Sequence, residues 1–342
     1  MPKDKKNKPQ KHYPFVSVCT PTYNRRPFIP TLIECFKNQT YPKYRVEWII
    51  LDDGTDKVGD MFDEDKIPQV KYFSLDEKIT LGKKRNLMHE KCKGSIIVYM
   101  DDDDYYPPER ISHAVEKLQK IPKALCAGSS ELHIYFNHIN ELWQMGPYNA
   151  QYATAGTFAF RKELLNITKY NEGASLAEEK EFLHNYTIPF VQLDSMKTIL
   201  VFAHDHNTYD KKKMLINPNE KFTKKSSKKV EHFIKNENED KIKKFFVEEM
   251  DKLLEEYPEG KPDMKPDVLK QIEELEEKRK IAQGKPENNQ IMVQKGNGES
   301  QPLTLELAVE IINNQQQDIM KLKEHIKYLE SVSKKEEVEL VE

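Results

Sequence analysis

Short apolar runs alternate with amphipathic segments along the first third of the chain. Four runs have the length and composition of β-strands, at residues 15–20, 46–51, 70–73 and 95–100. Three segments carry apolar side chains at three- and four-residue steps, which predicts helices, at residues 31–37, 83–92 and 110–120. The run at 95–100 is almost continuously apolar, as in a strand buried on both faces. The alternation predicts an α/β domain with a mostly parallel sheet flanked by helices.

Polar clusters follow three of these strands directly, after Cys19, Leu51 and Met100. The carboxyl ends of parallel strands meet at one edge of a sheet, and open α/β sheets bind their ligands there. We therefore expect the three clusters to converge on one site. Between residues 126 and 208 the pattern is mixed, and three more runs predict strands around that site: 131–136, 156–160 and 197–202.

The composition changes beyond about residue 209. An amphipathic helix is predicted over 240–257, and we expect its apolar face to pack on the preceding domain. A short charged helix follows over 266–282, so that residues 221–282 form a helical extension. Residues 283–302 are polar and contain Gly, Pro and Asn, which predicts a flexible linker.

The last segment, residues 303–334, carries a heptad repeat. Its first position holds Leu305, Ile312, Ile319 and Ile326, and its fourth holds Ala308, Gln315, Leu322 and Leu329. Isoleucine at the first position with leucine at the fourth favours a parallel two-stranded coiled coil, in which Gln315 would fix the register. The alternative is an amphipathic helix docked on its own domain. We favour self-association as a homodimer.

Charge and apolar content exclude some classes of partner. The formal net charge of −3 gives no global reason to expect nucleic acid. Residues 1–13 form a basic tail that we expect to be flexible. No signal peptide follows it, and no window approaches the roughly 18 apolar residues of a membrane helix. We therefore expect no membrane span and a cytoplasmic location. Four cysteines are expected to be buried free thiols of a reducing compartment: Cys19, Cys35, Cys92 and Cys126.

The acidic run at residues 101–104 is the strongest candidate for chemistry. Four adjacent carboxylates cannot all ionise comfortably without a counter-charge. A hard divalent cation such as Mg²⁺ or Mn²⁺ supplies one and prefers oxygen ligands. Because the run directly follows a predicted buried strand, we favour a metal site over the alternative of a solvated acidic turn.

Four motifs occur in order: PTYNR at 21–25, LDDGT at 51–55, GKKRN at 82–86 and MDDDD at 100–104. This ordered set resembles the family 2 type of inverting glycosyltransferases, whose GT-A fold has a Rossmann-like, mostly parallel sheet. The resemblance extends over roughly residues 14–208 and implies a GT-A domain over 14–220. It implies metal-dependent transfer of a sugar from a nucleotide-diphosphate sugar, with a UDP-sugar favoured, to a hydroxyl of a glycan or glycoprotein, with inversion.

The same resemblance implies roles for single residues. Nucleotide-sugar binding falls to Pro21, Thr22, Tyr23, Arg25, Asp52, Asp53, Lys83, Arg85, Asp101 and Asp102. Asp103 is implied as a metal ligand, although the acids on either side of it leave the register open by one residue.

The later motifs match less closely. Residues 155–161 are similar to the acceptor-side segment of the family. Glu178 and Glu179 stand where the family carries a Glu-Asp pair that includes the catalytic base, so both are candidates, and an exposed acidic turn is the alternative. HDHNT at 204–208 is similar to a late His-x-x-Asn-Thr segment, and its spacing implies His204 as a second ligand of Mn²⁺ or Mg²⁺.

Two rival functions remain open. A sugar nucleotidyltransferase has a related core but a Gly-rich first loop with Arg and Lys, whereas the first strand here ends in PTYN. A catalytically inactive scaffold that binds a carbohydrate or a protein partner would use the coiled coil as its working part. The intact set of acidic residues argues against the scaffold.

Overall fold

The computed structural model describes residues 12–62, 66–175, 179–216, 218–284, 292–294 and 300–339. The chain divides into two compact units, Met1–Leu275 and Glu276–Glu342. Residues 1–11 of the predicted basic tail lie outside the described residues. The predicted division of residues 14–282 into a catalytic domain and a helical extension remains a prediction.

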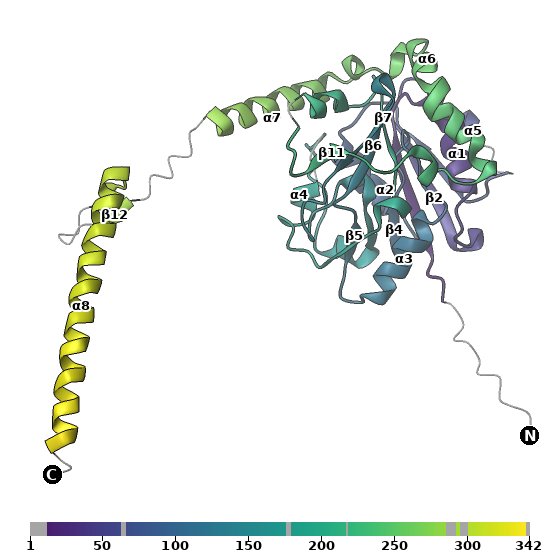
Figure 1. Ribbon diagram of the computed structural model, residues 1–342. Coiled ribbons are helices and arrows are strands. Elements are labelled where there is room, and N and C mark those ends of the chain that lie inside the picture. Colours follow the sequence, from purple (N-terminus) through teal and green to yellow (C-terminus); the bar gives the residue numbers. More distant parts are fainter. Residues whose placement is uncertain are drawn as a thin grey trace, which may run out of the picture. The chain divides into compact units, whose positions relative to one another are not determined.

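A seven-stranded sheet forms the centre of the first unit (Figure 1). Its strands, in spatial order, are β3 (Val70–Ser74), β2 (Val46–Asp52), β1 (Val16–Thr22), β4 (Ile96–Tyr99), β8 (Ala159–Arg161), β5 (Cys126–Gly128) and β9 (Phe190–Gln192). β1 is parallel to β2 and β4, and β2 is parallel to β3. β8 is antiparallel to both of its neighbours. The predicted α/β domain with a mostly parallel sheet is confirmed.

Three helices accompany the parallel strands: α1 (Ile29–Lys37), α2 (Leu81–Lys91) and α3 (Arg110–Lys120). Successive side chains of a strand point to opposite faces, so each strand supplies two cores. On one face Trp48 stacks on Phe36 of α1, with ring centroids 4.3 Å apart. On the other face Ile49 and Leu51 share a core with Met88 of α2. The three helices predicted from the apolar spacing are confirmed, with ends that differ by at most two residues.

The first strand is longer than predicted. The predicted run of 15–20 stops before Pro21, but β1 continues to Thr22 and pairs with β2 over that length. Its pairing with β4 stops at Cys19. Pro21 therefore lies where a ladder is formed on one side only, the place where a missing amide hydrogen is tolerated in a sheet.

A second sheet of four strands follows, in the order β10 (Val201–Ala203), β6 (Leu132–Phe136), β7 (Glu141–Met145) and β11 (Thr223–Lys225). The predicted strands at 131–136, 156–160 and 197–202 correspond to β6, β8 and β10. β8 and β10 begin later than predicted because 3₁₀ turns occupy Ala155–Thr157 and Ser195–Lys197.

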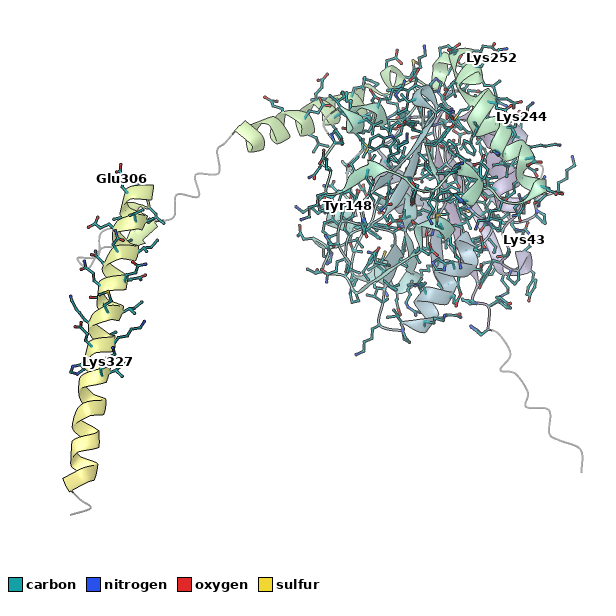
Figure 2. The ribbon with its side chains drawn as sticks, in the orientation of Figure 1. Lys43, Tyr148, Lys244, Lys252, Glu306 and Lys327 are labelled. Carbon is teal, nitrogen blue, oxygen red and sulfur yellow. The ribbon has the colours of Figure 1, made fainter. Side chains whose placement is uncertain are left out.

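The predicted amphipathic helix at 240–257 is built from α5 (Asp240–Lys244), a π-helical turn (Phe245–Glu249) and α6 (Met250–Glu255). Its apolar face packs on the preceding part of the first unit, as expected. Phe246 stacks on Phe202 with centroids 4.2 Å apart, and Phe245 meets Phe28 edge-on at 5.9 Å. Lys244 and Lys252 project from the opposite, exposed face (Figure 2). The predicted charged helix is α7 (Pro266–Gly284).

The second unit contains α8 (Leu305–Glu339), which confirms a helix over the heptad segment. Within the predicted linker, β12 (Met292–Gln294) pairs with β13 (Ser300–Pro302), while 285–291 and 295–299 lie outside the described residues. Ile312, Ile319 and Ile326 are 53%, 51% and 54% exposed in the single chain. The coiled coil and the homodimer remain predictions.

Two of the sequence expectations concern thiols and membranes. All four cysteines are free and buried, as predicted. None of the helices described for this chain combines the length and the apolarity that a membrane span requires.

Candidate functional site

A cavity of about 300 Å³ opens at the carboxyl ends of β1 and β4. Nine of the residues predicted for the site line it: Pro21, Thr22, Tyr23, Arg25, Arg85, Asp101, Asp102, Asp103 and Glu179. A volume of this size lies at the lower end of the range for small-molecule sites. The structure therefore brings together side chains that are up to 158 positions apart, from Pro21 to Glu179, at the predicted edge of the sheet.

Arg25 supplies the counter-charge for the acidic run. Its Nε lies 3.5 Å from Asp102 Oδ1, and its Nη2 lies 3.4 Å from Asp103 Oδ2. Nη2 also donates to the backbone oxygen of His206 at 2.8 Å. The guanidinium is buried, so its attraction for the two carboxylates is weakly screened. Arg25 was predicted as a nucleotide contact, and in this structure it pairs with two carboxylates of the acidic run.

Asp103 is the acid of the run whose pKa is lowered. Burial by itself would raise its pKa, but the nearby His204 imidazole, Arg25 and Lys211 together hold that pKa well below the usual range. A charged carboxylate at the mouth of the cavity is what a divalent cation requires.

The neighbours of Asp103 behave differently. Burial raises the pKa of Asp102 to about 7, with Arg25 opposing the shift and the charge of Asp103 adding to it. Burial and the charges of Asp103 and Asp101 raise the pKa of Asp104 well above its usual range. Asp104 does not line the cavity. This difference in pKa favours Asp103 as the candidate metal ligand, a choice that the sequence leaves open by one residue.

His204 lies behind Asp103, outside the residues that line the cavity. Its Nε2 is 3.4 Å from Asp103 Oδ2. Asn207 Oδ1 accepts from the His204 backbone amide at 2.9 Å, so the Asn207 amide nitrogen donates to Nε2 at 2.8 Å. We assign the proton to Nδ1 on this basis. Burial lowers the pKa of His204 to about 3, which keeps the ring neutral.

The 3.4 Å between Asp103 Oδ2 and His204 Nε2 is a spacing that two ligands of one metal ion could have. Donors bound to one ion at about 2.1 Å and about 90–109° apart lie about 3.0–3.4 Å from each other. Within the described part of the chain, no three acidic, histidine or cysteine side chains cluster closely enough to hold a metal by themselves. Mg²⁺ is commonly held by one or two protein ligands together with waters and substrate phosphates. The pair therefore suits a metal whose coordination is completed by a phosphate-bearing substrate.

Asp52 has a structural position. It is fully buried at the end of β2, and its carboxylate accepts from the amides of Gly54 and Val58 at 2.8 and 2.9 Å. Tyr72 donates to the same carboxylate at 2.7 Å. These bonds use its oxygens to shape the loop after β2, and Asp52 does not line the cavity. The sequence motif alone does not separate this role from a base contact.

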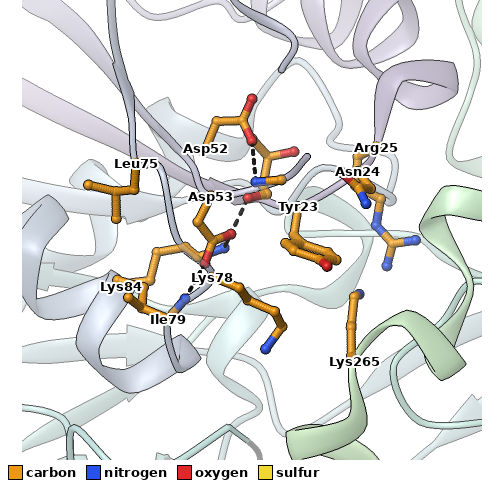
Figure 3. Close-up of polar contacts among 12 residues, drawn as sticks. Tyr23, Asn24, Arg25, Asp52, Asp53, Leu75, Lys78, Ile79, Lys84 and Lys265 are labelled. Carbon is orange, nitrogen blue, oxygen red and sulfur yellow. Dashed lines mark hydrogen bonds and ion pairs between the residues drawn. The ribbon is translucent and has the colours of Figure 1, made fainter. Parts of the chain in front are cut away.

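The Asp53 carboxylate is also bonded to other residues of the chain, and Asp53 does not line the cavity (Figure 3). It forms a salt bridge with Lys84 and accepts from the backbone amide of Ile79 at 2.9 Å. Lys84 Nζ also donates to the Thr22 oxygen at 2.9 Å. Lys83, the predicted cavity lysine, is exposed on the outside of α2, whereas Lys84 is buried and lines the cavity.

Arg85 enters the cavity from α2. Its guanidinium lies over the rings of Tyr99 and Tyr170, 4.8 and 5.2 Å from their centroids. Gly82 lets the start of α2 approach the chain closely, because a Cβ there would lie 2.0 Å from the Asn171 oxygen. Close packing against the Asn171 backbone thus explains the glycine of the GKKRN motif.

Glu179 is the first residue of α4 (Glu179–Phe182) and lines the cavity. The helix is anchored by Phe182, whose ring stacks on Tyr170 with centroids 4.2 Å apart. Glu178 lies outside the described residues, with 176 and 177. The choice of base between Glu178 and Glu179 therefore stays open.

The cavity also contains residues that sequence reasoning missed: Lys78, Lys84, Thr208 and Lys265. A signal for Lys84 existed, because it is four residues before the apolar Met88 and shares its helix face. No such signal marked Lys265, which precedes α7 in a Pro- and Lys-rich stretch outside every motif.

Comparison with known proteins agrees with the motifs. Residues 17–173 match the family model described as Glycosyl transferase family 2. The putative teichuronic acid biosynthesis glycosyltransferase TuaG of Bacillus subtilis is 30% identical over 30% of this chain and 41% of its own length. The poly(ribitol-phosphate) beta-N-acetylglucosaminyltransferase TarS of Staphylococcus aureus is 29% identical over 29% of this chain and 18% of its own.

A crystal structure of S. aureus TarS 1–349 is 21% identical, covers 55% of this chain and 60% of that chain, and has a TM-score of 0.43. The chain spans about two fifths or less of the length of the two curated relatives above. All four ordered motifs lie within the matched residues 17–173. The resemblance stated from the motifs is therefore confirmed.

Proposed function

We propose that this chain transfers a sugar from a nucleotide-diphosphate sugar to a hydroxyl group of a glycan or glycoprotein, with inversion, because residues 17–173 match the family 2 glycosyltransferase model. One observation carries the proposal. A single cavity at the strand ends holds the ionised carboxylate of Asp103, the carboxylate of Glu179 and five basic side chains. The basic residues are Arg25, Lys78, Lys84, Arg85 and Lys265.

These charged side chains suit both the donor diphosphate and the acceptor hydroxyl of such a reaction. The basic residues attract the diphosphate and stabilise the charge that develops on it as the glycosidic bond breaks. Tyr23 and Asp101, at the ends of β1 and β4, are placed to contact the nucleoside, with a UDP-sugar favoured by the family resemblance. Arg25 and Asp102 border the same space, but in the protein alone they pair with one another.

Asp103 and His204 would hold Mn²⁺ or Mg²⁺, which supplies a Lewis acid for the leaving diphosphate. The chain's own contribution is to keep the Asp103 carboxylate ionised and the His204 ring neutral and oriented. Arg25 would then be released from part of its pairing with the run.

Glu179 is proposed as the general base that accepts the proton of the acceptor hydroxyl, with Glu178 as the alternative. A carboxylate positioned within hydrogen-bond reach of the attacking hydroxyl contributes about 10²–10⁴-fold in rate. The attack comes from the face opposite the nucleotide, which inverts the anomeric carbon.

Turnover of a panel of UDP-, GDP- and dTDP-sugars with Mn²⁺ tests the proposal. We expect release of one nucleoside diphosphate, faster with acceptor glycans and abolished by EDTA. Absence of turnover together with absence of metal-dependent nucleotide binding would favour the inactive scaffold. Release of pyrophosphate from a nucleoside triphosphate and a sugar phosphate would instead indicate a sugar nucleotidyltransferase.

The heptad segment of α8 is proposed to pair two copies of the chain. Light scattering is expected to give a mass near twice the 40.2 kDa of one chain, and truncation after residue 302 should give the mass of one shortened chain. Ile319→Lys should dissociate the dimer, because it places a charge in the apolar seam. Glu324→Lys, on the outer face of the same helix, is the matched control and should leave the mass unchanged. A full-length mass of one chain contradicts the dimer.

A further inference from the structure

A segment beyond the family-matching residues closes one side of the cavity. We call residues 259–271 the closing segment; it leads into α7 and lies within the first compact unit. Four hydrogen bonds join it to loops that border the cavity. Asn24 Nδ2 donates to the Glu259 oxygen at 2.9 Å, and Tyr23 Oη donates to the Met264 oxygen at 3.2 Å. Lys78 Nζ donates to Asp267 Oδ1 at 2.6 Å, and the Ser175 amide donates to Gln271 Oε1 at 2.8 Å. These contacts fix Lys265, between Met264 and Asp267, against the site.

Lys265 is buried but poorly satisfied. It is 7% exposed, and its closest polar contact is Thr208 Oγ1 at 3.5 Å. Its ammonium lies 5.6 Å from the centre of the Tyr23 ring (Figure 3). It forms no salt bridge with any residue that the structure describes. A buried ammonium without a paired anion is costly, and burial accordingly lowers the pKa of Lys265 to about 7.

The other two lysines of the cavity are paired within the protein. Lys84 has Asp53 and the Thr22 oxygen as partners, and Lys78 has Asp267. Lys265 is therefore the lysine of the cavity that has no salt-bridge partner among the described residues. It faces the same space as Arg25 and the acidic run, where the phosphates of a donor bound near Asp103 would lie.

We infer that Lys265 binds the diphosphate of the nucleotide-sugar donor, so that the closing segment completes the donor site. The inference rests on the proposed function, because it assigns a residue to the donor cavity. An ammonium–phosphate hydrogen bond is charge-assisted, and it would satisfy the buried lysine while the donor is bound.

Isothermal titration calorimetry with Mn²⁺ present tests the inference. The probes are whichever of UDP, GDP and dTDP the wild-type chain binds most tightly, and the parent nucleoside of that diphosphate. Lys265→Met keeps the apolar stem and removes the charge; we expect about 10–100-fold weaker diphosphate binding and nucleoside binding within about two-fold. Lys265→Arg should retain diphosphate affinity within about five-fold. Lys261→Met, an exposed lysine of the same segment outside the donor cavity, is the matched control.

Equal diphosphate affinity in the wild type and Lys265→Met overturns the inference and leaves the proposed function standing. Equal losses of diphosphate and nucleoside affinity also overturn it, because they indicate a purely structural lysine. If the wild type binds none of the three diphosphates, the proposed function fails and the inference fails with it. Should Lys265→Met not fold, as judged by its melting curve, Lys265→Gln takes its place with the same expected losses.

Discussion

Replacing Asp103 by asparagine is expected to lower kcat by about 10³-fold, the scale found when one group that stabilises transition-state charge is removed. Asparagine keeps the shape of the side chain and removes the negative charge that His204, Arg25 and Lys211 hold in place. The apparent affinity for Mn²⁺ should fall in parallel, because a neutral amide is a weaker ligand than a carboxylate. Initial rates measured across a range of Mn²⁺ concentrations separate the two effects.

Asp104→Asn is the matched control for that variant. Asp104 is the next residue and is buried, but it does not line the cavity. Asparagine keeps the shape of this side chain, and the change lies outside the cavity, so kcat should stay within about two-fold of the wild type. A large loss in Asp104→Asn with normal activity in Asp103→Asn would move the metal ligand by one residue. Full activity in both variants would remove the acidic run from the mechanism.

Glu179→Gln is expected to lower kcat by about 10²–10⁴-fold, because glutamine cannot accept the acceptor proton. Affinity for the nucleoside diphosphate should stay within about two-fold, since the proposed role concerns the acceptor hydroxyl alone. The limb of the pH–rate profile that reports ionisation of the base should also disappear. Steady-state rates at varied donor, acceptor and pH measure all three quantities.

Glu181→Gln is the control for the base, two residues along α4. Its exposed carboxylate accepts from Asn171 Nδ2 at 3.2 Å and does not line the cavity, so activity should be unchanged. Glu178→Gln decides between the two candidates. A loss confined to Glu178→Gln would make Glu178 the base, and normal activity in both Glu178→Gln and Glu179→Gln would exclude this helix as its source.

The sequence determined the elements whose pattern is local. The apolar runs predicted the parallel strands β1 to β4, and the helical spacing predicted α3 at its observed limits, because both depend on residues within a few positions of one another. The ordered motifs at the strand ends predicted one site, and nine of its residues do line one cavity. The family resemblance came from the same ordered motifs and is confirmed by the match over residues 17–173.

Roles that depend on distant partners needed the tertiary structure. In sequence, Asp52 and Asp53 resemble a ligand-binding pair. In the structure, Tyr72 donates a hydrogen bond to Asp52 and Lys84 forms a salt bridge with Asp53. Lys84 takes the cavity position predicted for Lys83 because the turn of α2 points the two side chains apart.

The charge balance of the site was also decided in three dimensions. Arg25 reaches Asp103 across 78 positions of sequence, and Lys265 arrives from a segment beyond the matched residues. Hydrophobic periodicity carries no information about such encounters, because the field at a buried group is set by whichever charges the fold brings near it. The sequence by itself thus determined the sheet, its helices and the edge where the cavity opens. Only the tertiary structure decided which acid of the run has a lowered pKa, and which lysine of the cavity has no salt-bridge partner among the described residues.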